Sequence, residues 1–482
     1  MFNLFAKIKE AIHVRWRPRP QSRPTPVQPA ATPTSTTISY LMNDPTTPDL
    51  VVNMAPPIPP ARPLYAVQNY RGGGYATNTV EWQAANCFVT IAETLNYYDS
   101  QAEKPVGNWP GTSTLIVYPR AGVDLNAYYD RAGLKFFYYS NPRIGGDVFA
   151  CNSAEIVSHE CGHAILDTYR PDFWSAASLE VASFHEFFGD FTAIMHDLTH
   201  DELILRALNE TGGDLKKLNV IAKLAEQFGA AIAKLDPSGR NPAFLRCAIN
   251  DFKYANPGTL PQDAPDNELA AEPHNFSRVM LGTVYDIFVM IYDDFRQTSG
   301  MHPMDAIKAA RDLLTKYMIK TIINVPLNGK FYEAVARTML WCDVTTNNCK
   351  YHDRMQEIFS ARNINSANVA MMSLGALQPR CPVSNILRMG GTMRIKLSEH
   401  IVATLSNNPL LNVEVEVPHE SAFFFNNERA VHDTVASEHE DAIAAALDMV
   451  HYLHLAGKVG PDESTPFEIR DGKLVRTRSC CS

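Results

Sequence analysis

The hydrophobic pattern of this 482-residue chain changes its period several times, and each change marks a predicted element. Between residues 79 and 98 the apolar side chains recur at helical spacing, which predicts a helix. The runs TSTLIVYPRAGVD and LKFFYYSNPRIGG then alternate with turn signals and predict strands of a small sheet. From residue 152 to about residue 364 the apolar positions return to i, i+3 and i+4, so this part should be mostly helical.

The two ends of the chain have a different character. Residues 18–63 are crowded with proline, threonine and alanine, which predicts an unfolded linker, with folded structure beginning near Tyr65. After Pro379, MRIKLSEHIVATL and LNVEVEVP predict strands, EHEDAIAAALDMVHYLHLAG predicts a helix and PFEIRDGKLVRTR a hairpin. We therefore expect a disordered, basic, proline-rich arm over 1–64, a main domain over 65–378 and an appended α+β unit over 379–482. That unit should end in a mobile tail carrying Cys480 and Cys481.

The first twenty residues combine apolar positions at helical spacing with several lysines and arginines. They lack the long apolar core of a secretory signal, so the chain is expected to be cytoplasmic or exported without a recognisable signal. A membrane-surface helix or a targeting segment is one interpretation of them. A disordered arm that can touch a membrane surface or a partner is the favoured one.

Composition narrows the function classes. With 45% hydrophobic and 20% charged residues the chain is ordinary for a globular protein, and it has no apolar run long enough to cross a membrane. The formal charge of −9 gives no footprint for nucleic-acid binding. Nine scattered cysteines favour reduced thiols over a disulfide framework. From the chain length we expect about two or three domains, in a monomer.

One predicted helix carries candidate metal chemistry, in the segment NSAEIVSHECGHAILD. Asn152 and Glu155 have the spacing of a capping box that starts the helix. His159 and His163 stand four residues apart, on one side of the helix, where two imidazoles can share one cation. Glu160 is placed to act as a base on water beside that cation, which completes an H-E-x-x-H pattern.

A third ligand is expected from the next helix, SLEVASFHEFFGDFTAIMHDL. Glu186 lies among phenylalanines, where an unpaired carboxylate is costly. Its neighbour His185 is the alternative ligand. Glu186 is favoured because Asp190 follows one turn later on the same face, where it can accept a hydrogen bond from the far nitrogen of a ligand imidazole.

The two motifs together resemble those of the thermolysin-like zinc peptidases, the gluzincins, in which H-E-x-x-H precedes a helix with E-x-x-x-D. The resemblance covers roughly residues 65–364. It implies an α+β, zincin-type two-lobed fold, with a small β-rich N-terminal lobe over about 65–150 and a mostly helical C-terminal lobe over about 151–378. It also implies one catalytic Zn²⁺ on His159, His163 and Glu186, with Asp190 orienting His159.

The same resemblance assigns further residues. DLNAYYD is similar to the family's edge strand, so Asn126 and the Ala127 carbonyl would hold the substrate backbone. FLRCAIND is similar to the segment with an arginine that contacts substrate, here Arg246, and EPHNF to the stretch with the oxyanion histidine, here His274. The acidic partner of that histidine has no clear match; the candidates are Asp266, Glu268 and Glu272. Without the family resemblance, Asn126 is equally well explained as an edge-strand or turn asparagine, and for Arg246 a surface side chain is the favoured interpretation.

A second histidine pair, His196 and His200, imitates the metal motif at the end of the second helix. Because charged residues follow it, we interpret it as an exposed helix end. Asp197, Asp201 and Glu202 could hold Ca²⁺ as in some members of that family, but a solvated acidic face is favoured because no calcium loop is recognisable.

The expected activity is therefore that of a zinc endopeptidase acting on a polypeptide substrate, with a metal-activated water and Glu160 as general base. His274 is expected to stabilise the oxyanion. Two alternatives stay open. One is a binding scaffold that kept the fold with little or no turnover, and the other is a metallohydrolase of a non-peptide amide.

Overall fold

The structure is a computed structural model, and it describes residues 32–47, 51–236, 243–366, 385–400, 408–425, 431–461 and 465–479. The fold is mixed α+β, as predicted, with several small sheets around a large helical core. The basic segment at the start of the chain and the pair Cys480–Cys481 lie outside the described residues. The six cysteines that the structure does describe are free thiols.

The part of the proline-rich arm that the structure describes is folded, so the predicted unfolded linker is wrong from about residue 32 onward. Strand β1 (Ile38–Leu41) pairs antiparallel with β2 (Val51–Met54). Ile38 and Tyr40 point into the core, and the Leu41 amide donates to Asn86 Oδ1 on the following helix. A short apolar alternation inside a proline-rich stretch was enough to form an edge that buries two side chains.

A four-stranded sheet follows, in the order β3-β4-β6-β5. Its strands are β3 (Leu64–Val67), β4 (Thr114–Tyr118), β5 (Ala127–Tyr129) and β6 (Gly133–Phe136), and the hairpin β7 (Tyr138–Asn141) and β8 (Gly146–Phe149) lies after it. Helix α2 (Val80–Gln101) confirms the first predicted helix, and Thr79 caps it by accepting a hydrogen bond from the Trp82 amide. Strand β5 ends the sheet, so one of its edges is not covered by another strand of that sheet.

The middle of the chain is helical, as predicted. Its helices are α3 (Ala154–Tyr169), α4 (Leu179–Asp197), α5 (Asp201–Thr211), α6 (Glu226–Leu235), α7 (Pro273–Ser299), α8 (Pro303–Asn324), α9 (Phe331–Asn347) and α10 (His352–Ala361), with a two-residue pairing of β9 (Lys223–Leu224) and β10 (Arg246–Cys247). Short 3₁₀ turns connect them: η1 (Ala150–Asn152), η2 (Pro171–Phe173) and η3 (Pro257–Thr259). Helix α4 is buried along its whole length and packs against α2, α3, α7 and α9. It is therefore the axis around which polar side chains can be held away from water.

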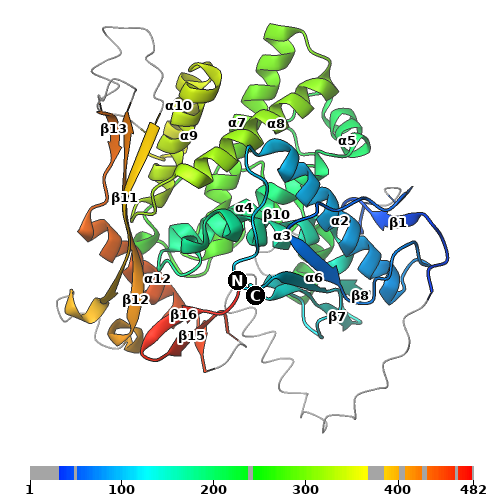
Figure 1. Cartoon of the computed structure of the whole chain (residues 1–482), viewed down its shortest axis with the longest axis horizontal. Helices are drawn as coiled ribbons and strands as arrows, with labels where there is room; N and C mark the ends of the chain where they lie inside the picture. Colours follow the sequence, from blue (N-terminus) through cyan, green and yellow to red (C-terminus); the bar gives the residue numbers. More distant parts are fainter. Residues whose placement is uncertain are drawn as a thin grey trace.

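The last part of the chain forms a second, smaller core. Its strands are β11 (Asn385–Lys396), β12 (Glu414–Phe425), β13 (Val431–Val435), β14 (Val459–Gly460), β15 (Phe467–Arg470) and β16 (Lys473–Arg476). They form one sheet in the order β11-β12-β16-β15-β14, and β13 also pairs with β12. One helix, α12 (His439–Leu455), and two 3₁₀ turns, η4 (Leu397–Glu399) and η5 (Pro409–Asn412), complete the unit. This core includes Leu179 and Ala182 from the start of α4, and the Ala177 amide donates to Glu416 O. Figure 1 shows this unit on one side of α4 and the β1–α2 region on the other.

Within the described ranges, none of the helices combines the length and the apolar character that crossing a bilayer requires.

Candidate metal centre

Helix α3 places two imidazoles side by side. The helix begins at Ala154, and its cap is Ser153, whose hydroxyl accepts from the Ile156 amide. The predicted cap, Asn152, belongs instead to the preceding 3₁₀ turn, so that prediction was wrong by one residue. His159 and His163 are both buried, and their ring centroids lie 4.7 Å apart. The spacing of one helical turn thus places the two imidazole rings next to each other on the same side of α3.

Helix α4 brings a carboxylate to that pair. Glu186 Oε2 lies 3.6 Å from His159 Nε2, and Glu186 Oε1 lies 3.8 Å from His163 Nε2. Glu160 joins His159 and His163 in a group whose ligand atoms all fall within 4.8 Å of one another. His185, the alternative ligand, packs its ring against Trp174 and His163 instead. The structure therefore brings together the four side chains of the predicted centre.

The spacing of these atoms fits a tetrahedral ion. Ligand bonds of about 2.0–2.2 Å at tetrahedral angles separate neighbouring ligand atoms by about 3.3–3.6 Å. Each imidazole has one Glu186 oxygen close to that range, Oε2 at 3.6 Å from His159 Nε2 and Oε1 at 3.8 Å from His163 Nε2. The donor set of two imidazoles and one carboxylate is one that zinc takes in catalytic sites. The residues present accordingly fit a zinc ion.

A second layer of polar contacts holds His159 in place. Its Nδ1 lies 2.9 Å from Asp190 Oδ1. Arg246 donates two hydrogen bonds to the same Asp190 carboxylate, from Nε to Oδ2 at 2.6 Å and from Nη2 to Oδ1 at 2.7 Å. Since the Arg246 side chain is only 10% exposed, its interpretation as a surface arginine is wrong. Such a carboxylate fixes the tautomer and the orientation of a ligand imidazole.

His274 approaches the centre from the first turn of α7. Its Nε2 lies 3.2 Å from Glu186 Oε2, and its Nδ1 lies 2.6 Å from Glu272 Oε1. Helix α7 begins at Pro273, and Glu272 caps it by accepting a hydrogen bond from the Asn275 amide. Of the three candidate acidic partners, the structure therefore selects Glu272.

Burial and neighbouring charge set the protonation of these groups. Burial alone would lower the pKa of His159, but its contacts with Asp190 and Glu186 raise it to about 9. Burial lowers the pKa of His163 to about 3, so this ring keeps its lone pair. Burial opposes the charge on Glu272, yet the nearby His274 holds its pKa down at about 2. The carboxylates around His159 thus favour a positive charge there, which a proton or a divalent cation can supply.

A cavity opens beside the centre, with a volume of roughly 720 Å³ counting its open side. Its wall includes His159, Glu160 and His274, and its remaining lining is largely apolar: Leu125, Ile156, Ala193, Leu224, Ala225, Phe228, Ile232 and Leu245. Asn126 lines it as well, whereas Ala127 lies next along β5 and is paired in register with Phe136. Further along the same strand, the Tyr129 carbonyl accepts from the Ser479 amide at 2.7 Å.

Gly189, which lies against the His159 ring, was not predicted from the sequence to belong to the centre. A Cβ placed on Gly189 would lie 2.5–2.7 Å from three atoms of the His159 ring, so only glycine lets this imidazole lie against α4. A glycine inside an otherwise apolar helix is a signal of such a close approach. The pattern HEFFGD contained it, between Glu186 and Asp190.

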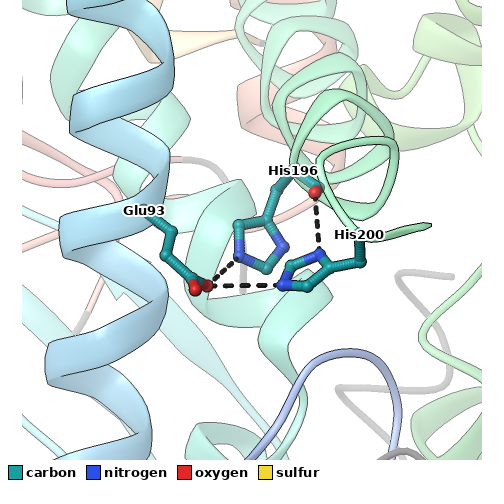
Figure 2. Close-up of side chains that lie close together, drawn as sticks. All are labelled: Glu93, His196 and His200. Carbon is teal, nitrogen blue, oxygen red and sulfur yellow. Dashed lines mark hydrogen bonds and ion pairs between the residues drawn. The ribbon is translucent and has the colours of Figure 1, made fainter. Parts of the chain in front are cut away.

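The second histidine pair is not an exposed helix end, and that interpretation was wrong. His196 is 1% and His200 8% exposed, and both face Glu93 from α2, as Figure 2 shows. Asp197 is also buried, so the predicted solvated acidic face is wrong at this position. A different acidic group, Asp44, Glu155 and Glu226, has the spacing to hold a cation, and burial raises the pKa of its members.

Comparison with known protein families and with curated proteins gives no match to this chain. The centre is therefore interpreted from its own geometry.

Proposed function

We propose that this chain is a zinc-dependent endopeptidase of the thermolysin-like type, built on a zincin-type two-lobed fold. One observation carries the proposal: His159, His163 and Glu186 converge at the spacing of zinc ligands, with Glu160 beside them. A purely structural zinc site has four protein ligands and no use for a base next to an open position. The cavity at this centre supports a catalytic role over a structural one.

Zinc bound by these three ligands would supply Lewis acidity, which acidifies water and polarises a carbonyl. The Glu160 carboxylate accepts the proton of the attacking water and then passes it to the nitrogen of the leaving amine. One carboxyl group thus serves as base and then as acid, and the peptide C–N bond breaks with no net change in the protein. Asp190 is hydrogen-bonded to Nδ1 of His159, so Nε2 is the ring nitrogen that would hold the zinc ion.

His274 is placed to stabilise the charge that develops on the substrate oxygen. Burial opposes a charge on His274, but the neighbouring carboxylates of Glu186 and Glu272 raise its pKa above the usual histidine value. With Nδ1 engaged by Glu272, Nε2–H is the donor that faces the centre. A donor aimed at a developing oxyanion typically contributes about 2.7–4 kcal/mol to transition-state stabilisation.

The cavity and the neighbouring edge of β5 together suit a peptide substrate in extended form. Strand β5 ends its sheet, and such an edge can pair with an added strand through main-chain hydrogen bonds. Asn126 stands where that edge meets the cavity. The apolar lining favours a substrate with a large apolar side chain next to the bond that is cut. Since Ser479 already occupies the edge at Tyr129, the pairing available to a substrate is short.

The test is the variant Glu160→Gln, which keeps the shape of the side chain and removes the base. With the zinc-loaded full chain and a mixture of peptides, we expect zinc to stay bound while hydrolysis falls by a factor of about 10²–10⁴. Glu202→Gln, the same change at an exposed position on α5, is the matched control and should hydrolyse peptides at the wild-type rate.

Two results would count against the proposal. Equal hydrolysis by Glu160→Gln and the control would remove Glu160 as the base. A wild-type chain that binds zinc and cleaves no peptide in the mixture would favour a binding scaffold or an enzyme for another amide.

A further inference from the structure

A second group of side chains that could bind a metal lies outside the proposed active site. It is at the C-terminal end of α4, the helix that carries Glu186. His196 is in the last turn of α4, His200 precedes the first turn of α5, and Glu93 comes from the middle of α2. Glu93 Oε2 lies 3.3 Å from His196 Nε2 and 3.5 Å from His200 Nε2. Figure 2 shows the three side chains pointing toward one another. These separations fall in the range of about 3.3–3.6 Å expected between neighbouring ligands of a tetrahedral zinc ion.

The hydrogen bonds around His200 leave a lone pair in this space. Its Nδ1 lies 3.2 Å from the His196 carbonyl oxygen, which can only accept, so Nδ1 carries the hydrogen. In the neutral ring Nε2 then holds a lone pair, directed at Glu93. This arrangement, with the far nitrogen donating to a backbone carbonyl, is the one that metal-ligating histidines commonly adopt.

Tyr40 cannot satisfy every acceptor around it. Its hydroxyl lies 3.0 Å from Glu93 Oε1 and 3.1 Å from His200 Nε2, but it has a single hydrogen to donate. His196 Nε2 lies within hydrogen-bond distance of Glu93 Oε2 and can donate to it, but the lone pair of a neutral His200 Nε2 still lies 3.5 Å from the same oxygen. The space between them is largely closed to water, because the Glu93 side chain is 18% exposed and that of His200 9%. Facing acceptors in such a place need a positive charge between them.

His196 adds a second indication. Its Nδ1 has no hydrogen-bond partner among the described residues, although the ring is fully buried. Asp197 Oδ1 lies 3.8 Å away and likewise accepts no hydrogen bond from the part of the chain that the structure describes, while Asp197 Oδ2 accepts from Asn43. A small rotation of the ring would join the two, giving the carboxylate–histidine–metal arrangement that orients ligand imidazoles.

We propose that Glu93, His196 and His200 form a second metal-binding site, which takes a divalent transition cation such as Zn²⁺. Two imidazoles and one carboxylate are a donor set suited to zinc and its neighbours and poorly suited to calcium. The ion would tie α2 to the junction of α4 and α5, next to the strand that carries Tyr40. None of its ligands lines the cavity beside the first centre, so its role is to stabilise the fold.

The test counts zinc ions in full chains that are stripped with a chelator, equilibrated with Zn²⁺ alone and freed of excess metal. We expect two ions per wild-type chain, one in Glu93→Gln and one in Glu186→Gln. These two changes remove one carboxylate charge from each centre and leave side-chain volume the same. His451→Gln, a change to an exposed histidine on α12, is the control and should keep both ions.

A second readout keeps the test decisive if Glu93→Gln does not fold. In Glu186→Gln the remaining ion should show two imidazoles and oxygen ligands by X-ray absorption, and added zinc should raise the melting temperature. The proposal is overturned if wild type holds one ion and Glu186→Gln holds none, since a proton alone then bridges Glu93 and the histidines. It is also overturned if Glu93→Gln keeps two.

Discussion

Two groups of side chains along helix α4 contain the same residue types in different surroundings. In each, two histidines four residues apart meet one glutamate from another helix. The first centre has Glu160 and a largely apolar cavity beside its side chains, whereas the second has Tyr40 and is largely closed to water. If both proposals hold, two histidines and a glutamate provide a cation site in each case, and the neighbouring base and cavity decide whether that site can catalyse a reaction.

The largest difference between the centres should appear at His274, which has no counterpart beside the second one. His274→Ala should lower kcat for peptide hydrolysis by about 10²–10³, because a donor to the oxyanion is lost, while KM changes far less. Steady-state kinetics on the zinc-loaded variant measure both. A rise in KM with kcat intact would assign His274 to substrate binding instead.

The carboxylates behind the ligands should differ as well. Asp190 Oδ1 is hydrogen-bonded to His159 Nδ1, whereas Asp197 Oδ1 lies 3.8 Å from His196 Nδ1. Asp190→Asn should therefore weaken zinc binding at the first centre by about 10–100-fold. Asp197→Asn should weaken the second centre less, as competition with a zinc-sensitive dye can measure. Equal losses would mean that both carboxylates orient their ligands in solution.

The close packing at Gly189 is also particular to the first centre. Gly189→Ala should push the His159 ring from its place, at a cost of about 1–3 kcal/mol in zinc binding at that centre. The second site should keep its ion, so at a zinc concentration that just fills both sites of wild type, the zinc count per chain should fall from two toward one. Unchanged affinity at the first centre would show that the ring can shift and still bind the ion.

The smallest effect is expected at Tyr40. Tyr40→Phe removes a hydroxyl that contacts Glu93 and His200, which should cost about 1 kcal/mol of folding free energy in the metal-free protein. Denaturant unfolding with and without zinc measures this cost. If the hydroxyl is instead displaced when the ion binds, the cost should shrink once zinc is present.

The sequence predicted the first centre better than the second for a physical reason. His159, Glu160 and His163 share one helix, so spacing alone places them together, and Glu186 was found because a carboxylate among phenylalanines needs a partner. The second pair was predicted to be exposed because charged residues follow it. Its burial depends on Glu93 and Tyr40, more than a hundred residues earlier in the chain, and no local pattern reports such contacts.

The same limit applies to the fold. The helices between residues 152 and 364, and the appended α+β unit, follow from local periodicity and were predicted. The strand Ile38–Leu41 was missed because the prolines around it outweighed four alternating residues, whose burial comes from packing on α2. Glu272 could be selected from three acids only once the cap of α7 was seen.

We propose above all that His159, His163 and Glu186 hold a zinc ion with Glu160 beside it. Anomalous scattering at the zinc edge, measured on crystals of the zinc-loaded protein, tests it most directly. We predict a peak about 2.0–2.2 Å from His159 Nε2, from His163 Nε2 and from a Glu186 oxygen, with Glu160 outside bonding distance. A map without a peak among these three side chains, or with Glu160 as a ligand of the ion, would contradict it.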